Sequence, residues 1–192
     1  MLKPSNSIIL ASGSPRRKQI LSEAGIIFEV KTKPTPETFP KSLPIDQIAQ
    51  YLAQAKANAF SDELSNHIII AADTIVVMGD IVLGKPANFE EAFSMLKMLS
   101  GNTHEVITGV CILSTNKMDV FSDRTKVTFR NLSDDEIVYY INNYQPFDKA
   151  GSYGIQEWIG QIGIENISGS YYNVMGLPIH LVYQKLQSFL PN

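Results

Sequence analysis

The run Ile68–Val77 constrains the fold more than any other part of this 192-residue chain. Its residues are almost all apolar, and most are β-branched, which favours a strand. A nearly continuous apolar strand needs cover on both faces, as in parallel or mixed sheets that lie between helices. No apolar stretch of the sequence approaches the roughly 20 residues of a membrane-spanning helix. The sequence therefore predicts an α/β protein with this strand buried in its sheet.

Asp73 interrupts this apolar run. An ionised carboxylate is costly to bury unless a cation, a metal ion or several hydrogen-bond donors compensate it. A carboxylate that binds a metal or activates a water molecule meets this requirement, and a strand would hold it rigidly. The alternative is an aspartate at a strand bend that pairs with a structural arginine or with backbone amides. Both interpretations require a partner for Asp73.

The segment Ser7–Arg17 predicts a strand, a tight loop and the start of a helix. Ser14 can cap the helix, and Pro15 fits its first position, where no N–H is needed. Several groups that bind phosphate then meet at the start of this helix. They are backbone N–H groups, the positive end of the helix dipole, two hydroxyls and two guanidiniums. The side chains concerned are those of Ser12, Ser14, Arg16 and Arg17. The Gly-Lys-Ser/Thr ending of a Walker A loop is missing. A capped helix with solvated arginines is the alternative.

Composition and charge exclude several classes of protein. A net charge of −3 and a pI near 5.6 argue against a general binder of nucleic acid or of acidic membranes. The content of 44% hydrophobic and 18% charged residues is typical of a globular protein, and the length suits a single domain over residues 1–192, or at most a domain with one lobe attached. The single cysteine, Cys111, excludes an internal disulfide and a cysteine-based zinc cluster, and its apolar surroundings predict burial. Met1–Asn6 lacks a signal-peptide pattern, so we expect a cytoplasmic protein.

Strand and helix patterns alternate along the rest of the chain, without a clear linker or an internal repeat. This arrangement indicates a mixed sheet within one α/β domain. The further predicted elements are a helix from Pro15 to near Gly25, a strand 26–31, a helix from Ile45 to about Leu64, a return strand 81–83, a helix capped by Asn88 and closed at Ser100-Gly101, paired strands 106–113 and 120–129, a helix with a Ser133/Glu136 capping box, and a helix 178–189.

Two lysines are candidates for binding an anion. Pro86 fixes the backbone after Lys85, which aims the ammonium group, and Lys85 lies only a hairpin away from Asp73 in sequence. Lys56 is the only charge within the alanine-rich stretch Ala53–Phe60. The alternatives are a solvated Lys85 and a Lys56 whose apolar stem covers the core while its charge reaches water.

The segment Asp148–Gln156 (Asp-Lys-Ala-Gly-Ser-Tyr-Gly-Ile-Gln) has two glycines within four residues, which allow a flat ligand to approach the backbone closely. Gln156 carries a donor group and an acceptor on one amide, which suits the edge of a pyrimidine ring. A plain glycine turn is the alternative. The three histidines, at 67, 104 and 180, show no metal-ligand spacing.

These motifs together resemble the Maf family of nucleotide pyrophosphatases. The hallmarks are Ser-x-Ser-Pro-Arg-Arg, an Ala-Asp-Thr strand, Gly-Lys-Pro and Asp-Lys-Ala-Gly-x-Tyr-Gly-Ile-Gln, and all occur here in order, followed by the matching ending Gly169–Pro178. The resemblance covers essentially the whole chain. It implies a metal-dependent cytoplasmic hydrolase that cuts a nucleoside triphosphate into monophosphate and pyrophosphate. The implied fold is an elongated mixed sheet flanked by helices, similar to that of inosine triphosphatases (Maf/Ham1-like).

The resemblance also implies a role for each motif residue. Asp73 would be the general base and a metal contact. The implied substrate-binding residues are Ser12, Ser14, Arg16, Arg17, Lys56, Thr74, Lys85, Lys149 and Gln156. Arg16, Thr74 and Gln156 would set specificity. The subgroup selective for 7-methyl-GTP typically has an aromatic residue before the arginine pair and lacks Tyr-Gly-Ile-Gln, so this sequence favours dTTP and UTP.

Two departures from the family pattern concern the metal. Many relatives have Asp-Glu where this chain has Pro36-Glu37, and relatives often have glutamate where this chain has Gln145. Glu37 is therefore predicted as a second metal ligand beside Asp73, without a further acidic neighbour. With few carboxylates and a triphosphate to share the ion, we expect Mg²⁺ or Mn²⁺.

The predicted function is hydrolysis of dTTP, of UTP and of modified pyrimidine nucleotides whose ring has the same hydrogen-bonding edge. This hydrolysis would be a house-cleaning activity, because it prevents the incorporation of these nucleotides into nucleic acids. The predicted partner is a nucleoside triphosphate, with no nucleic acid and no membrane, and relatives are commonly homodimers. Two alternatives stay open. One is a nucleotide-binding regulator of septum formation with little turnover, since relatives are associated with cell-division arrest. The other is a pyrophosphatase directed at purines or at 7-methyl-GTP.

Overall fold

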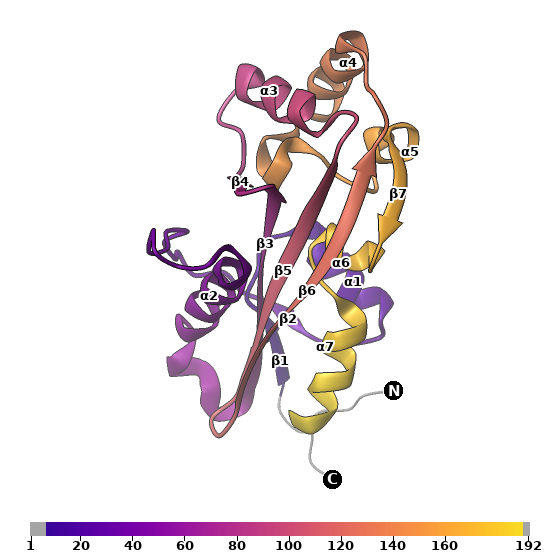
Figure 1. The fold of residues 1–192 in the computed structure, drawn as a ribbon. Helices are drawn as coiled ribbons and strands as arrows, with labels where there is room; N and C mark the ends of the chain where they lie inside the picture. The colour runs from indigo at the N-terminus through magenta and orange to yellow at the C-terminus, as the bar shows by residue number, and fades with distance from the viewer. Residues whose placement is uncertain (1–6, 190–192) are drawn as a thin grey trace. The chain divides into compact units, whose positions relative to one another are not determined.

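The structure, a computed structural model, describes residues 7–189. The start of the chain, whose lack of a signal pattern underlies the expected cytoplasmic location, lies outside this range. Helices surround a seven-stranded mixed sheet, which confirms the predicted α/β class (Figure 1). Within residues 7–189, no helix has both the length and the apolar character needed to cross a membrane.

The elements follow one another with short connections. In chain order they are β1 (Ser7–Leu10), α1 (Pro15–Glu23), β2 (Glu29–Val30), α2 (Ile45–Asn58), the 3₁₀ helix η1 (Ser61–Asn66), β3 (His67–Met78), β4 (Ile81–Leu83), α3 (Phe89–Leu99), β5 (Thr103–Leu113), β6 (Met118–Phe129), α4 (Asp134–Tyr144), η2 (Pro146–Asp148), η3 (Ala150–Ser152), α5 (Trp158–Gly163), β7 (Ile164–Ser168), α6 (Tyr171–Met175), α7 (Ile179–Leu186) and η4 (Gln187–Phe189).

The sheet combines parallel and antiparallel pairs. Its strand order is β2-β1-β3-β5-β6-β7, and β4 pairs with β3 outside this path. β1 is parallel to both β2 and β3, with Ile8 opposite Ile68. β4 and β7 run antiparallel to β3 and β6. The predicted hairpin from β3 to β4 is confirmed, with Gly79 of its turn at φ +59°.

The chain divides into two compact units. The first contains the described residues up to Asp73, together with Thr108–Asp123 and the residues from Gly176 onward. The second contains Thr74–Ile107 and Arg124–Met175. β3, β5 and β6 each contribute residues to both units. The single domain over residues 1–192 stays a prediction.

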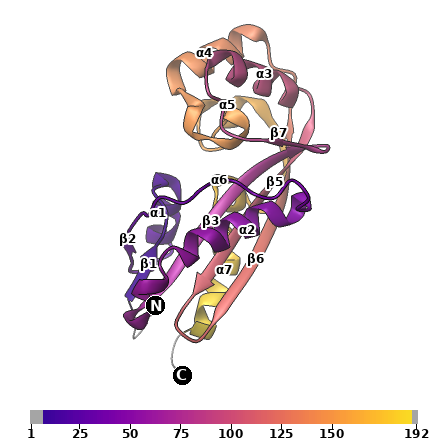
Figure 2. The same ribbon diagram turned by 90° about the vertical axis from the view of Figure 1, so that its left-hand side faces the viewer.

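In the first unit, alternate residues of the strands face α2. α2 and α7 cover opposite faces of the strands (Figures 1 and 2). The core beneath α2 is made by Ile9, Ala11, Ala53, Ala57, Phe60, Ile69, Ala71, Cys111 and Leu113. Cys111 is buried as predicted, and burial raises the pKa of its thiol to about 12. A side chain at Gly109 would collide with the backbone of Ala49, so this glycine lets α2 approach β5 closely.

In the second unit, α3 packs on α4 and on η3 (Figure 2). The predicted helix starts are confirmed. The Asn88 side chain accepts a hydrogen bond from the N–H of Glu91 at 2.9 Å. Ser133 and Glu136 form a capping box in which each side chain accepts from the other's backbone N–H. These local bonds fix where α3 and α4 begin.

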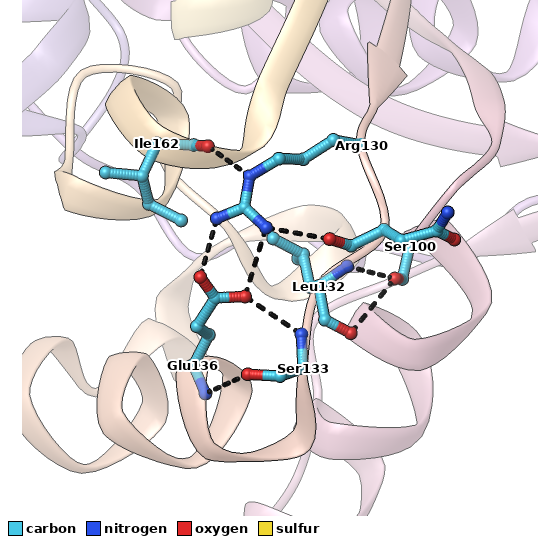
Figure 3. A network of polar contacts seen from close by, with 7 residues as sticks. Ser100, Arg130, Leu132, Ser133, Glu136 and Ile162 are labelled. Atoms are coloured by element: carbon cyan, nitrogen blue, oxygen red, sulfur yellow. Dashed lines mark hydrogen bonds and ion pairs between the residues drawn. The ribbon is translucent and has the colours of Figure 1, made fainter.

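Arg130, directly after β6, joins three segments of the second unit (Figure 3). Its Nε donates to the carbonyl of Ile162 at 2.6 Å, and its Nη2 donates to Glu136 at 2.6 Å. Ser100 bonds the backbone of Leu132 beside it. The hydrogen bond from Arg130, followed by that from the N–H of Ser133, lowers the pKa of Glu136 to about 2. This network ties the ends of α3, α4 and α5 to the sheet.

Three predicted elements differ from the structure. The strand predicted over 26–31 is limited to Glu29–Val30, which pair with Ile9 and Leu10 of β1. The helix predicted to run to Leu64 stops at Asn58, since Phe60 turns into the core, and η1 follows it. The last helix is shorter than 178–189 and tightens into η4, as helix ends often do.

The ion pair between Glu136 and Arg130 predicts a pH-dependent stability. A carboxylate with a lowered pKa in the folded state stabilises the fold above its ordinary pKa of 4.5, and this contribution is lost as the pH falls from 4.5 towards 2. The unfolding free energies of the parent and of Glu136→Gln in urea should therefore differ most above pH 5 and converge as the pH falls towards 2. Glu90→Gln, an exposed control on α3, should follow the parent over the whole range. A difference that is constant with pH would contradict this account.

Candidate active site

The loop after β1 has the predicted strand–loop–helix geometry. Ser14 occupies the N-cap position with an extended backbone, and Pro15 begins α1. The hydroxyl of Ser14 makes no capping hydrogen bond, so this part of the prediction is wrong. Its backbone N–H donates instead to Oγ of Ser12 at 3.3 Å. The buried Ser12 hydroxyl thus accepts a hydrogen bond within this loop, whereas Ser14 was predicted to cap the helix.

Arg17 secures this loop from the helix side. Its Nη1 donates to Oγ of Ser12 at 3.2 Å, and its Nε donates to the carbonyl of Gly176 at 2.7 Å. Burial lowers the pKa of the guanidinium, while the negative charges of Asp73 and Glu37 oppose this lowering and Arg16 adds to it. These charges therefore lie close enough to act on one another. The first unit brings together the arginine pair, Asp73 and Glu37, as the sequence predicts for a phosphate and metal site.

Lys56 is the cation that compensates Asp73. Its Nζ lies 2.5 Å from Oδ1 of Asp73 and 2.8 Å from Oε1 of Glu37. The side chains of Lys56 and Asp73 are only 17% and 12% exposed, so their charges meet largely out of water. The partner that Asp73 requires is thus a lysine in the last turn of α2, which replaces the structural arginine considered from the sequence.

The carboxylates of Asp73 and Glu37 fit a metal ion that is shared with a substrate. Both reach the same ammonium nitrogen, so one cation can contact both. Mg²⁺ is commonly bound by one or two carboxylates together with substrate phosphates. Among residues 7–189 there is no group of three or more His, Cys, Asp or Glu side chains that could hold a metal alone. The donors suit a metal that arrives with a triphosphate.

Three predicted segments meet in the second unit. The N–H of Gly151 donates to the carbonyl of Gly84 at 3.0 Å, which places the glycine turn beside the Gly-Lys-Pro segment. Gly151 has φ +69°, and a side chain there would press on Val76 of β3. Thr74, on the same strand, is half-buried, and Lys85 is exposed. Thr74, Lys85 and the glycine turn therefore belong to one unit.

Gln156 presents an unused acceptor at this turn. Its side-chain Oε1 is buried and has no hydrogen-bond partner within residues 7–189. A buried acceptor without a partner is costly in a folded protein, so it favours a ligand that donates to it. The imide N–H of thymine and of uracil is such a donor.

Lys149, like Lys56, is paired with carboxylates of the protein. Its ammonium is buried and lies 2.7 Å from Oδ1 of Asp148 and 3.1 Å from Oε1 of Glu157. Glu157 was missed by the sequence analysis, which ended the motif at Gln156. Its partner Tyr140 lies 17 positions earlier on α4, and no local pattern connects them.

His104 is a second residue whose contact with the glycine turn the sequence analysis did not predict. Its Nε2 lies 2.8 Å from the hydroxyl oxygen of Tyr153, and both side chains are buried. Burial lowers the pKa of His104 to about 4, so the ring is neutral at neutral pH. The signal that could have found it is the tyrosine in the glycine turn, whose hydroxyl needs a partner once it is buried.

The fold and these residues define a class of protein. It is an α/β protein with a cationic loop beside a buried carboxylate in its first unit and an amide-bearing glycine turn in its second unit. The profile of the family described as Maf-like protein matches residues 7–189, and the chain belongs to this family.

Curated relatives agree over nearly the whole chain. A protein of Flavobacterium psychrophilum named dTTP/UTP pyrophosphatase is 54% identical over 177 residues, 92% of this chain and 91% of its own length. A protein of Phocaeicola vulgatus with the same name is 54% identical and covers 94% of each chain. The solved structure of the Staphylococcus aureus Ham1 protein has a TM-score of 0.51 and 17% identity, over 95% of this chain and 98% of its own. This likeness confirms the Ham1-like fold.

The bonds of Arg17 lead to a stability prediction. Lysine keeps the charge but cannot donate to both Ser12 and Gly176 from one planar group, so Arg17→Lys should lower the free energy of unfolding by about 1–2 kcal/mol. Lys18→Arg, on the exposed side of α1, is the matched control and should change it by less than about 0.5 kcal/mol. Denaturant unfolding measures both. Equal effects would show that the two bonds of Arg17 do not hold the loop.

Proposed function

We propose that this protein is a nucleoside triphosphate pyrophosphatase that hydrolyses dTTP and UTP to the monophosphate and pyrophosphate. The observation that carries the proposal is the convergence of Asp73 and Glu37 on Lys56. A binding protein for an anion has no need of two carboxylates at that point. The names of relatives 54% identical to this chain support the same substrates.

The residues of the first unit supply positive charge for the phosphates. Arg16 and Arg17 begin α1, where the helix dipole adds to their charge, and Lys56 stands beside the carboxylates. Ser12 and Ser14 line the same loop. In the second unit, Lys85 adds a further cation. Phosphoryl-type displacement depends mainly on positioning and on charge stabilisation, so such a set of groups is sufficient.

Asp73 acts as the general base in this proposal. It accepts a proton from water as the water oxygen bonds to phosphorus, and the phosphoanhydride bond breaks with its electron pair leaving on pyrophosphate. Lys56 holds the carboxylate in place through Oδ1. Asp73 and Glu37 would also hold Mg²⁺ or Mn²⁺, which when bound neutralises phosphate charge as a Lewis acid.

Gln156, with Thr74 and Arg16, is assigned to selectivity. Thymine and uracil offer an N–H donor beside a carbonyl acceptor, which matches the two ends of an amide, whereas cytosine offers an amino donor instead of that carbonyl. The orphaned Oε1 of Gln156 supports this assignment. Modified pyrimidines with the same edge belong to the proposed substrates. A cytoplasmic location, a homodimer and a house-cleaning role stay predictions from the sequence.

A product-resolved assay tests the proposed function. Purified protein is incubated with each natural nucleoside triphosphate, with ITP and with 7-methyl-GTP, in the presence of Mg²⁺ or Mn²⁺. We expect monophosphate and pyrophosphate from dTTP and UTP, and no product when the metal is chelated. Preferred hydrolysis of 7-methyl-GTP or ITP would contradict the pyrimidine assignment. Saturable binding without turnover would favour a nucleotide-binding regulator.

Replacement of Gln156 by alanine should relax selectivity. Because the amide that distinguishes the pyrimidine edge is lost, the ratio of kcat/KM for dTTP to that for dCTP should fall by about tenfold or more. Gln161→Ala, an exposed glutamine on α5, is the matched control and should keep the parental ratio. An unchanged ratio in Gln156→Ala would remove Gln156 from the selectivity set.

A further inference from the structure

A line of buried polar contacts runs beneath the glycine turn. The Lys149 ammonium pairs with Oε1 of Glu157 at 3.1 Å. Oε2 of Glu157 accepts a hydrogen bond from the hydroxyl of Tyr140. The Tyr140 oxygen in turn accepts the N–H of Gly154 at 3.0 Å. Burial, together with the charge of Glu157, raises the pKa of Tyr140, so the neutral phenol remains the donor to Glu157.

The turn is anchored on both sides of Gln156. The N–H of Glu157 donates to the carbonyl of Gly154 at 3.0 Å, and the Tyr153 hydroxyl bonds His104 of β5 at 2.8 Å. The Tyr153 ring also packs edge-on against Phe129, with 5.1 Å between ring centroids. A side chain at Gly154 would collide with the carboxylate of Glu157. The carboxylate therefore lies directly against the turn.

Selectivity for one pyrimidine edge requires such an anchor. An amide presents its oxygen or its nitrogen after a half-rotation, so a loosely held glutamine would accept either thymine or cytosine. The orphaned Oε1 of Gln156 must be held where the ligand reaches it. A buried ion pair contributes little to stability, and a role in fixing conformation accounts for its presence here.

We propose that Lys149 is a positioning residue, which fixes Glu157 and, through Tyr140, the turn that presents Gln156. This role takes the place of the direct substrate contact that the sequence predicts for Lys149. The proposal rests on the proposed function, because it concerns how the same protein selects its base. Both carboxylates beside Lys149 engage its ammonium within the unit, which supports a partner inside the protein.

A double-variant cycle separates the two roles of Lys149. Lys149→Met leaves Glu157 without its cation, and Lys149→Met/Glu157→Gln removes both charges while an amide oxygen can still accept from Tyr140. For each variant, two quantities are measured: the kcat/KM ratio of dTTP to dCTP, and the inhibition constant of inorganic tripolyphosphate. Lys97→Met, an exposed lysine on α3, is the matched control.

We expect Lys149→Met to reduce the dTTP/dCTP ratio by about tenfold, with an unchanged inhibition constant for tripolyphosphate. The double variant should recover most of the ratio. Tyr140→Phe, which keeps the packed ring and removes only the hydroxyl, should reduce the ratio as Lys149→Met does. It therefore tests the proposal even if Lys149→Met does not fold.

Weaker tripolyphosphate inhibition in Lys149→Met that the double variant does not recover would overturn the proposal in favour of a phosphate contact. A parental ratio in both Lys149→Met and Tyr140→Phe would also overturn it. Failure of the proposed function is seen separately, in the parent, as absence of dTTP and UTP hydrolysis.

Discussion

The ion pair between Asp73 and Lys56 is the interaction on which the rest of the first unit depends. Asp73 lies on a strand whose neighbours are nearly all buried, and such a carboxylate is tolerated only with a close cation. Lys56 can reach it because Ala53 and Ala57 give α2 a flat inner face and Gly109 lets the helix approach the sheet. The close apolar packing of α2 on the sheet thus brings the Lys56 ammonium to Asp73.

The same pair explains how the site can use a carboxylate chemically. Glu37 bonds the same ammonium as Asp73, so the lysine balances two negative charges before any ligand binds. Arg17 lies close enough for both carboxylates to act on its pKa. Cations and carboxylates are therefore interleaved at the start of α1, which suits a triphosphate that carries its own metal ion.

In the proposed function, the second unit has a different role, because it has to hold the uncharged amide of Gln156 in one orientation. Arg130 and Glu136 secure the helix ends, while Glu157 and Tyr140 reach the glycine turn itself. These contacts are hydrogen bonds and ion pairs between a few side chains and the backbone. Their effect is to restrict conformation, which is what recognition of a base edge requires.

Local signals in the sequence were sufficient for much of this fold. The apolar run of β3, the Asn88 cap and the Ser133/Glu136 capping box depend on residues within a few positions, and all three are confirmed. The motif residues lie in two units, and their common site stays a prediction. Partners that depend on packing could not be predicted. Lys56 lies 17 positions from Asp73 and reaches it only once α2 has docked.

The same limit applies to the second unit and to the shorter elements. Tyr140 meets Glu157 from another helix, and nothing near either residue indicates the pairing. β2 consists of the two residues that pair with Ile9 and Leu10 of β1, and the sequence of β2 does not contain this pairing. Long-range geometry decided each of these features, whereas residue type and spacing decided the confirmed ones.

The most direct test of this account is the unfolding free energy and dTTP turnover of Lys56→Met, Asp73→Asn and the double variant, measured side by side. We expect Lys56→Met to lose about 3 kcal/mol or more because Asp73 is left buried without a cation, and the double variant to recover most of this loss. Both Asp73→Asn and the double variant should turn over dTTP orders of magnitude more slowly than the parent. A double variant no more stable than Lys56→Met, or one with parental turnover, would contradict the account.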